Sequence, residues 1–229
     1  MAGSGASVHI RGRIRKLFEG IDAEPVGQED SFAMTQQFEQ LVAMGAAPYR
    51  EIVKMGRSFF TGTTTAVAAV VAIPTTAVAL AIYNNEPDGG RSYVIDWVAA
   101  SGVAKTAAAG QCQMLANVGQ IRETAPTNAN LAIKKANGLG VGNDTKALTI
   151  ISGTALPAGT GIAANWFPIG PSFGAPGAAA TPGNGAWVPV DGRFIVPPGR
   201  YFAVTVLADV VGSTFQDYIS WHEVQLTLG

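Results

Sequence analysis

The C-terminal three quarters of this 229-residue chain has very few charged residues. The 172 residues from Ser58 to Gly229 include only 8 lysines or arginines and 9 aspartates or glutamates, and the 44 residues between Lys146 and Asp191 include none. In an ordinary soluble domain about a quarter of the residues are charged, and most of these lie on its surface. We therefore expect other copies of the chain, or partner proteins, to cover much of the surface of this segment.

Cysteine and histidine are also scarce. The single cysteine, Cys112, cannot form an intrachain disulfide and has no nucleophile motif around it, so we interpret it as a buried thiol. Of the two histidines, His9 lies in the N-terminal tail and His222 in the last expected strand. His222 and Glu223 are adjacent on that strand, so they point to opposite faces and cannot bind one metal ion together. The sequence predicts no metal site, no cofactor and no catalytic residues.

Two further classes of partner are disfavoured. The net charge of −1 gives no overall attraction to nucleic acid. The apolar run from Ala66 to Tyr83 has the length to cross a bilayer, but Pro74, Thr75 and Thr76 interrupt it. Two buried strands around a turn fit this pattern better. We expect neither a nucleic-acid partner nor a membrane partner.

Residues 1–57 differ in composition from the rest, with 14 charged residues, 7 of each sign. A Gly/Ser tail leads into a basic run, and an acidic stretch follows it: Arg11, Arg13, Arg15 and Lys16, then Glu19, Asp22, Glu24, Glu29 and Asp30. A helix is predicted from Ser31 to Met44, with one apolar face formed by Met34, Phe38, Leu41 and Val42. A second short helix is predicted from Pro48 to Met55. This N-terminal arm has two open interpretations: it packs on its own β domain, or it docks on a neighbouring subunit.

Residues 58–229 are predicted to be a β domain. Short apolar runs alternate with turn residues such as Asp191-Gly192 and Pro197-Pro198-Gly199. The expected strands are Ala66–Ile73, Val78–Tyr83, Ser92–Ala99, Gln111–Ile121, Ala147–Ser152, Trp187–Val190, Arg193–Val196, Tyr201–Ala208 and Tyr218–Leu228. A long uncharged loop is expected at Pro168–Ala186. The fold class is mainly β: an antiparallel jelly-roll-like sandwich with a partly helical N-terminal arm.

A family resemblance rests on the stretch from Phe194 to Val204, which reads FIVPPGRYFAV. It is similar to the strand–turn–strand ends of trimeric jelly-roll proteins. Residues 60–229 as a whole resemble the small β proteins with which tailed bacteriophages decorate or cement capsids, or build fibres. The resemblance implies homotrimers in a virion, placed on a capsid shell and contacting the major capsid protein or another virion protein. It implies no catalytic residues.

These observations predict a non-enzymatic virion structural protein, a capsid decoration or cement component that assembles as a homo-oligomer, with a trimer expected. The residues expected at its interfaces are Arg11, Arg13, Arg15, Lys16, Met34, Phe38, Leu41, Phe167, Phe173 and Trp187. One alternative is a fibre or receptor-binding module for carbohydrate. Its sugar-stacking residues would be Tyr83, Trp97, Trp166, Trp187 and Trp221. The other is a hydrolase on the same fold, which the scarcity of histidines and acids disfavours.

Overall fold

The computed structural model describes residues 50–75, 78–104, 110–119, 125, 133–139, 145–151, 166–174, 184–209 and 212–226. The chain divides into two compact units, Met1–Glu51 and Ile52–Gly229. The predicted helix Ser31–Met44 and all other expectations for residues 1–49 lie outside the described residues. Helix α2, Arg50–Lys54, falls within the predicted second helix and precedes the first strand.

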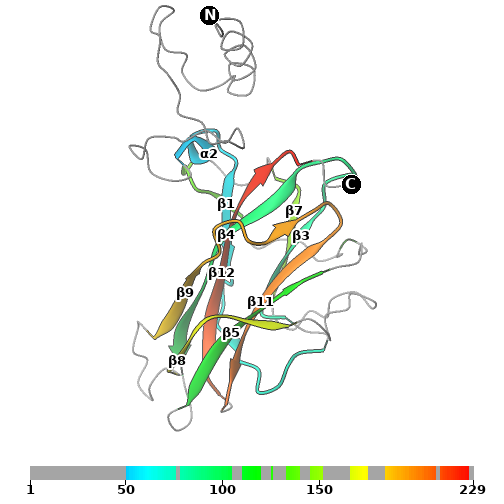
Figure 1. Ribbon diagram of the computed structural model, residues 1–229. Coiled ribbons are helices and arrows are strands. Elements are labelled where there is room, and N and C mark those ends of the chain that lie inside the picture. The colour runs from blue at the N-terminus through cyan, green and yellow to red at the C-terminus, as the bar shows by residue number, and fades with distance from the viewer. Residues whose placement is uncertain are drawn as a thin grey trace, which may run out of the picture. The chain divides into compact units, whose positions relative to one another are not determined.

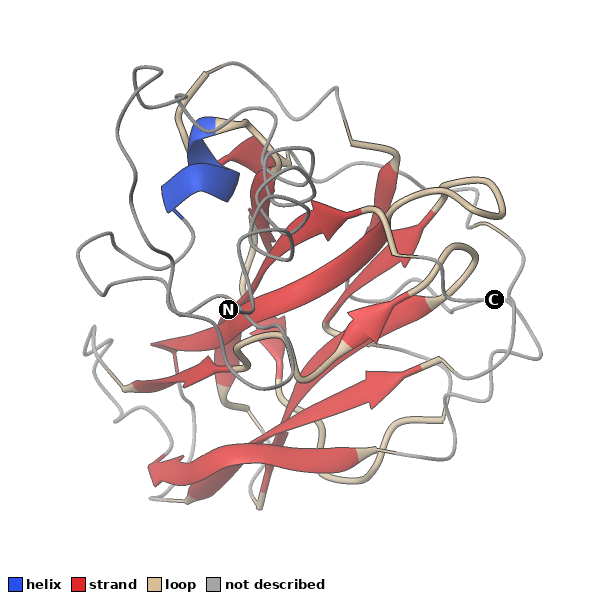
Figure 2. Ribbon diagram, turned by 45° about the horizontal axis from the view of Figure 1, so that its top comes forward, coloured by secondary structure: helices blue, strands red, loops and turns tan. Residues whose placement is uncertain are grey.

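The second unit is a sandwich of two antiparallel sheets (Figures 1 and 2). The five-stranded sheet has the order β7-β3-β11-β5-β8, and the seven-stranded sheet has β10-β4-β12-β1-β6, with β2 also paired to β12 and β9 to β4. The five-stranded sheet contains β3 (Leu80–Asn84), β5 (Gln111–Val118), β7 (Ala147–Ile151), β8 (Phe167–Gly174) and β11 (Tyr201–Ala208). The seven-stranded sheet contains β1 (Ser58–Gly62), β2 (Val67–Ala68), β4 (Ser92–Ala104), β6 (Lys134–Lys135), β9 (Gly185–Pro189), β10 (Ile195–Val196) and β12 (Thr214–Val224).

The main strands pair in a nested order. With β7 and the two-residue strands β2, β6 and β10 set aside, the strands in chain order are β1, β3, β4, β5, β8, β9, β11 and β12. The first of these pairs with the last, the second with the seventh, the third with the sixth and the fourth with the fifth. The strands are therefore paired as in one long hairpin, and successive strand pairs alternate between the two sheets.

The core lies between the two sheets, where apolar side chains of both inner faces meet. Trp221 of β12 is fully buried and packs against Phe59 and Tyr93. A bulge in β4 makes this arrangement possible, because Ser220 pairs with Trp97 while Trp221 pairs with Ile95. The extra residue, Asp96, shifts the alternation of β4, so that the side chains on both sides of the bulge reach the core.

Several predicted strands are confirmed. The prediction Tyr201–Ala208 matches β11, and Gln111–Ile121 and Ala147–Ser152 contain β5 and β7. Two predictions are wrong. Residues 66–73 contain only the two-residue β2, and β8 (Phe167–Gly174) occupies the first part of the expected loop Pro168–Ala186. Strand β8 contains Pro168 and Pro171, and it lies at an edge of the sheet, where the missing N–H groups of proline are tolerated.

Strand β1 was not expected at all, because Ser58–Gly62 has only three residues that favour a strand on their own. Its place between β12 and β6 supplies the pairing that the segment needs. Among the described residues, no helix combines the length and the hydropathy needed to cross a bilayer.

Two acids, Asp217 and Glu223, are buried on the inner face of β12, and Asp217 is the one without a basic partner among the described residues. Asp217 is 1% exposed and shares this face with Phe215 and Ile219. Its backbone N–H donates to Thr63 Oγ1 at 3.0 Å, whereas its Oδ1 has no hydrogen-bond partner among the described residues. Burial raises the pKa of the Asp217 carboxyl from 3.8 to about 7. The folded protein therefore holds a proton on Asp217 under conditions in which the unfolded chain loses it.

The substitution Asp217→Asn tests this ionisation, because it keeps the shape of the side chain and removes the charge. The favourable contribution of the protonated carboxyl is complete below pH 3.8 and is lost as the pH rises through about 7. We expect the variant to lose this part of the pH dependence and, at pH 8, to gain up to about 4 kcal/mol in free energy of unfolding.

The measurement is thermal or urea unfolding between pH 4 and pH 8. The exposed Asp88→Asn is the matched control, and we expect it to follow the wild-type profile. Parallel profiles for Asp217→Asn and wild type would show that the buried carboxyl does not titrate as stated.

Candidate assembly surface

The outer side of the seven-stranded sheet carries apolar and aromatic side chains. Side chains along a strand point alternately to its two faces. Each of five strands has a residue that points into the core, so the residue next to it points outward. These core residues are Phe59, Val98, Ala186, Val196 and Ile219. We define the outer aromatic face by five outward side chains: Phe60 of β1, Trp97 of β4, Trp187 of β9, Ile195 of β10 and Tyr218 of β12. An antiparallel sheet with one face in water normally has polar side chains there. The five side chains make part of this face apolar, beside polar residues such as Ser220 and Gln216.

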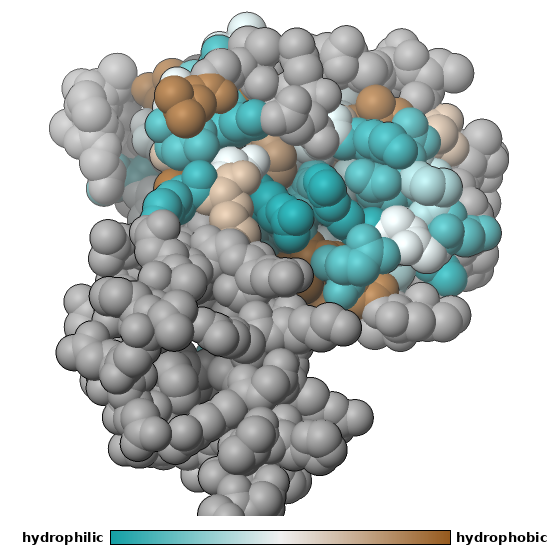
Figure 3. Space-filling view, turned by 90° about the horizontal axis from the view of Figure 1, so that it is seen from above, coloured by the Kyte–Doolittle hydropathy of each residue, from teal (hydrophilic) through white to brown (hydrophobic). Residues whose placement is uncertain are grey.

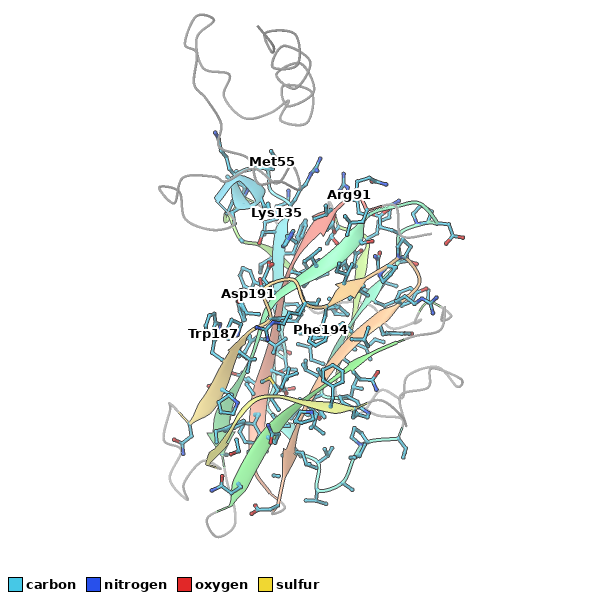
Figure 4. All side chains as sticks on the ribbon, in the orientation of Figure 1. Met55, Arg91, Lys135, Trp187, Asp191 and Phe194 are labelled. Atoms are coloured by element: carbon cyan, nitrogen blue, oxygen red, sulfur yellow. The ribbon has the colours of Figure 1, made fainter. Side chains whose placement is uncertain are left out.

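Trp187 is the most prominent residue of this face, with 62% of its surface exposed. Strand β9 has the burial pattern of a half-buried strand, with Ala186 and Val188 turned inward and Trp187 outward. The Trp187 and Trp97 rings have centroids 6.5 Å apart and planes inclined by 42°. Figure 4 shows Trp187 on the outer side of β9. A large exposed ring supported by a second ring is a typical anchor for a protein interface.

Tyr218 lies flat against strand β1 because the residue opposite it is Gly62. A Cβ atom at position 62 would lie 2.3 Å from Cδ1 of the Tyr218 ring and 3.2 Å from the carbonyl oxygen of Asp217. The Tyr218 hydroxyl and Gln216 Oε1 are 3.0 Å apart and form a hydrogen bond on the same face. The glycine thus sets how closely the ring packs on the sheet.

Beneath the outer aromatic face, His222 and Asp96 form a buried pair. His222 Nδ1 lies 2.6 Å from Asp96 Oδ1, and each residue is less than a tenth exposed. The backbone carbonyl of Asp96 also accepts hydrogen bonds from the N–H groups of Val190 and Asp191. The bulge at Asp96 therefore links β4 and β12 to the turn after β9. The two backbone hydrogen bonds to the Asp96 carbonyl hold that turn against β4.

A second group of polar residues lies near the C-terminal end of β12. Glu223 is buried and contacts Thr145 Oγ1 at 2.5 Å and Arg91 Nη1 at 3.1 Å. Burial raises the pKa of Glu223, and the hydrogen bonds from Thr145 and Arg91 partly oppose that rise. Glu86, whose charge also raises the pKa of Glu223, pairs with Lys146 at 3.5 Å. Each acid has a basic partner, so this arrangement is a network that joins loops at one end of the sandwich.

The interface residues that the sequence predicted lie in different parts of the structure. Trp187 is exposed on the outer aromatic face. Phe167 and Phe173 are half-buried and pack on the core, with ring centroids 5.2 Å from Phe194 and 5.8 Å from Phe215. The other predicted interface residues lie outside the described residues: Arg11, Arg13, Arg15, Lys16, Met34, Phe38 and Leu41.

The aromatic residues predicted to stack on a sugar also lie in different parts of the structure. Tyr83 and Trp221 are buried, and Trp166 packs beside the buried cluster that contains Tyr83. Only Trp97 and Trp187 reach the outer aromatic face. Among the described residues, no group of three or more histidine, cysteine or acidic side chains is placed to hold a metal ion.

Sequence reasoning missed three members of the face: Phe60, Ile195 and Tyr218. The signal for Tyr218 was present in the alternation of the last strand, where every second residue faces the core. Phe60 belongs to the strand that was not expected. Comparisons of this chain with protein-family models, with curated proteins and with solved structures found no match.

The close approach of Tyr218 to Gly62 yields a stability prediction. Gly62→Ala places a methyl group against the ring and the backbone of β12, and overpacking of this kind costs about 1–3 kcal/mol of unfolding free energy. In a Tyr218→Ala background the ring is absent, so the cost of Gly62→Ala is expected to fall below about 1 kcal/mol. Urea unfolding of the four proteins in this double-mutant cycle measures both values.

Gly174→Ala is the control for the Gly62 cycle. No atom lies within 4 Å of a Cβ built at Gly174, so we expect a change within about 0.5 kcal/mol. An equal cost of Gly62→Ala with and without the Tyr218 ring would show that the ring does not restrict position 62.

Proposed function

We propose that this chain is a non-enzymatic structural protein of a virion, a capsid decoration or cement component that assembles as a homo-oligomer. The observation that carries the proposal is the outer aromatic face, an apolar surface on a body that has very little charge. Such a surface is unfavourable in water, at about 25 cal/mol for each Å² of apolar area. Contact with a neighbouring copy removes that cost and stabilises the assembly.

The nested strand order supports a jelly-roll body. In a jelly roll a long hairpin is wound so that its first strand pairs with its last, and the winding yields two packed sheets. The pairs β1·β12, β3·β11, β4·β9 and β5·β8 follow this order. In the proposed fold β7 is an added strand that extends the five-stranded sheet beyond β3. Viral capsid domains are among the proteins that use jelly rolls.

The chemistry of the face suits a protein interface. Interface cores are poor in charged residues and rich in tryptophan, tyrosine and phenylalanine, and a few such rings supply most of the binding energy. A stable interface buries about 800 Å² on each partner. In the proposed trimer the face of each copy meets a different surface of the next copy, and the ring closes after three contacts. Other exposed surfaces remain for contact with the capsid shell.

The test is the mass of the purified chain in solution. We expect light scattering and sedimentation at micromolar concentration to give three times the chain mass of 23.6 kDa. The double variant Phe60→Ser with Trp187→Ser is expected to weaken association at least about tenfold, which corresponds to about 1.4 kcal/mol. Its far-ultraviolet circular dichroism should stay that of the wild type, because both side chains are exposed.

A matched control removes equally exposed apolar side chains elsewhere. Val71 and Ile73 are 54% and 56% exposed and lie in the segment between β2 and β3, away from the outer aromatic face. We expect Val71→Ser with Ile73→Ser to associate like the wild type. A wild-type chain that stays monomeric and stable at high concentration would overturn the proposed assembly.

A carbohydrate-binding module is the second candidate, and the exposed pair Trp97 and Trp187 favours it. Two inclined rings on a surface form a platform on which the apolar side of a sugar can stack. A glycan array probed with wild type and with Trp187→Ala separates the candidates. Binding that the variant loses would favour the carbohydrate function, and an array without a hit would remove it.

A further inference from the structure

The chain contains two Asn-Gly pairs, Asn137-Gly138 and Asn184-Gly185, and both lie among the described residues. An asparagine side chain that precedes glycine is open to attack by the backbone nitrogen of the glycine, because glycine has no side chain to hinder the approach. The attack closes a five-membered ring and releases the side-chain amide as ammonia. How readily it occurs depends on how the fold holds each pair.

The first pair lies in an exposed turn that follows the two-residue strand β6. The N–H of Gly138 donates to the carbonyl of Lys135 at 3.1 Å, and the N–H of Leu139 donates to Asn137 Oδ1 at 3.0 Å. Leu139 is 72% exposed. Figure 4 shows Lys135 near one end of the sandwich, and Figure 3, which looks onto this end, shows hydrophilic and hydrophobic residues side by side. Water therefore reaches the turn.

The hydrogen bond from Leu139 prepares Asn137 for the attack. It folds the side-chain amide forward along the backbone, so that Cγ lies on the side of the Gly138 nitrogen. The same N–H polarises the Cγ–Oδ1 bond and stabilises the negative charge that develops on Oδ1 during the attack. The Gly138 N–H must first leave the Lys135 carbonyl. Because that bond closes only an exposed turn of four residues, it opens at low cost.

The second pair is held by the sheet. The carbonyl of Asn184, which belongs to the same peptide unit as the Gly185 nitrogen, accepts a hydrogen bond from the Gly102 N–H at 2.7 Å. Gly185 is the first residue of β9 and pairs with Ser101 of β4. A Cβ atom at position 185 would lie 2.2 Å from the carbonyl oxygen of Ala100, so the two backbones are in close contact there. Turning this peptide unit toward the asparagine side chain requires the end of β9 to separate from β4.

We propose that Asn137 is a site of spontaneous deamidation in the folded protein and that the fold protects Asn184. The Gly138 nitrogen attacks Asn137 Cγ, a bond forms between these two atoms, and the Cγ–Nδ2 bond breaks. The amide proton of Gly138 leaves with the Nδ2 group as ammonia. Water then opens the ring at either of its carbonyl groups, and the product is aspartate or isoaspartate.

The reaction changes the charge and the backbone near the border of the outer aromatic face. Asn137 Nδ2 and Lys135 Nζ lie 3.3 and 3.9 Å from a Cβ atom built at Gly56, so either product adds a negative charge near the Lys135 ammonium group. Isoaspartate also lengthens the main chain, shortly after Lys134, which pairs with Phe60 of that face. The reaction needs only water and does not depend on the proposed assembly.

The test follows both asparagines in the full-length wild-type chain during incubation at pH 8. Peptide mapping by mass spectrometry measures the converted fraction of each, and an isoaspartate assay identifies the isomer. We expect Asn137 to react at least about tenfold faster than Asn184, which corresponds to a difference of about 1.4 kcal/mol in barrier height. In concentrated urea the fold no longer distinguishes the two sites, so their rates should agree within about twofold.

Asn137→Gln is the matched control, because it keeps the amide and lengthens the side chain by one methylene group. We expect no conversion at position 137 in this variant and an unchanged rate at Asn184. Equal rates at the two sites of the folded chain, or a faster reaction at Asn184, would overturn the proposal. A tenfold difference that persists in urea would also overturn it, because the difference would then come from the neighbouring sequence and not from the fold.

Discussion

The pairing of β12 with β4 is the contact on which the rest of the body depends. These are the longest strands, they pair along nearly their whole lengths in the middle of the seven-stranded sheet, and β1, β2 and β9 pair along their sides. Their inner sides carry the core residues Trp221, Ile95 and Ile219. Their outer sides carry Tyr218 and Trp97 of the aromatic face. A shift of one residue in this register would exchange the two faces and place the core side chains in water.

The inner face of β12 carries acids among its apolar core residues. The inner face holds two acids, Asp217 and Glu223, among its apolar residues, whereas the outer face holds an aromatic ring. A buried carboxyl costs stability unless it is paired or protonated. Glu223 is paired with Arg91, and Asp217 has a raised pKa.

Charge is distributed unevenly along the chain. The body has few charges, and most acids of residues 1–57 lie in one stretch without basic residues. Among the described residues, Glu223 and Glu86 near the C-terminal end of β12 have the basic partners Arg91 and Lys146. Lys134 lies opposite the exposed Phe60 at the other side of the same sheet.

The sequence alone determined the coarse fold class, a mainly β sandwich. Alternating apolar runs and turn residues predicted β11, β5 and β7, because these strands are largely buried and consist mostly of apolar residues. The scarcity of charge predicts a surface that neighbouring chains cover, and this stays a prediction. Only the tertiary structure decided which residues share a face. Strands β1 and β8 exist because of the strands beside them, and the bulge at Asp96 redirects the residues of β4. Pairing across the sheet, which no local pattern encodes, brought Phe60 next to Lys134 and turned Phe167 and Phe173 toward the core.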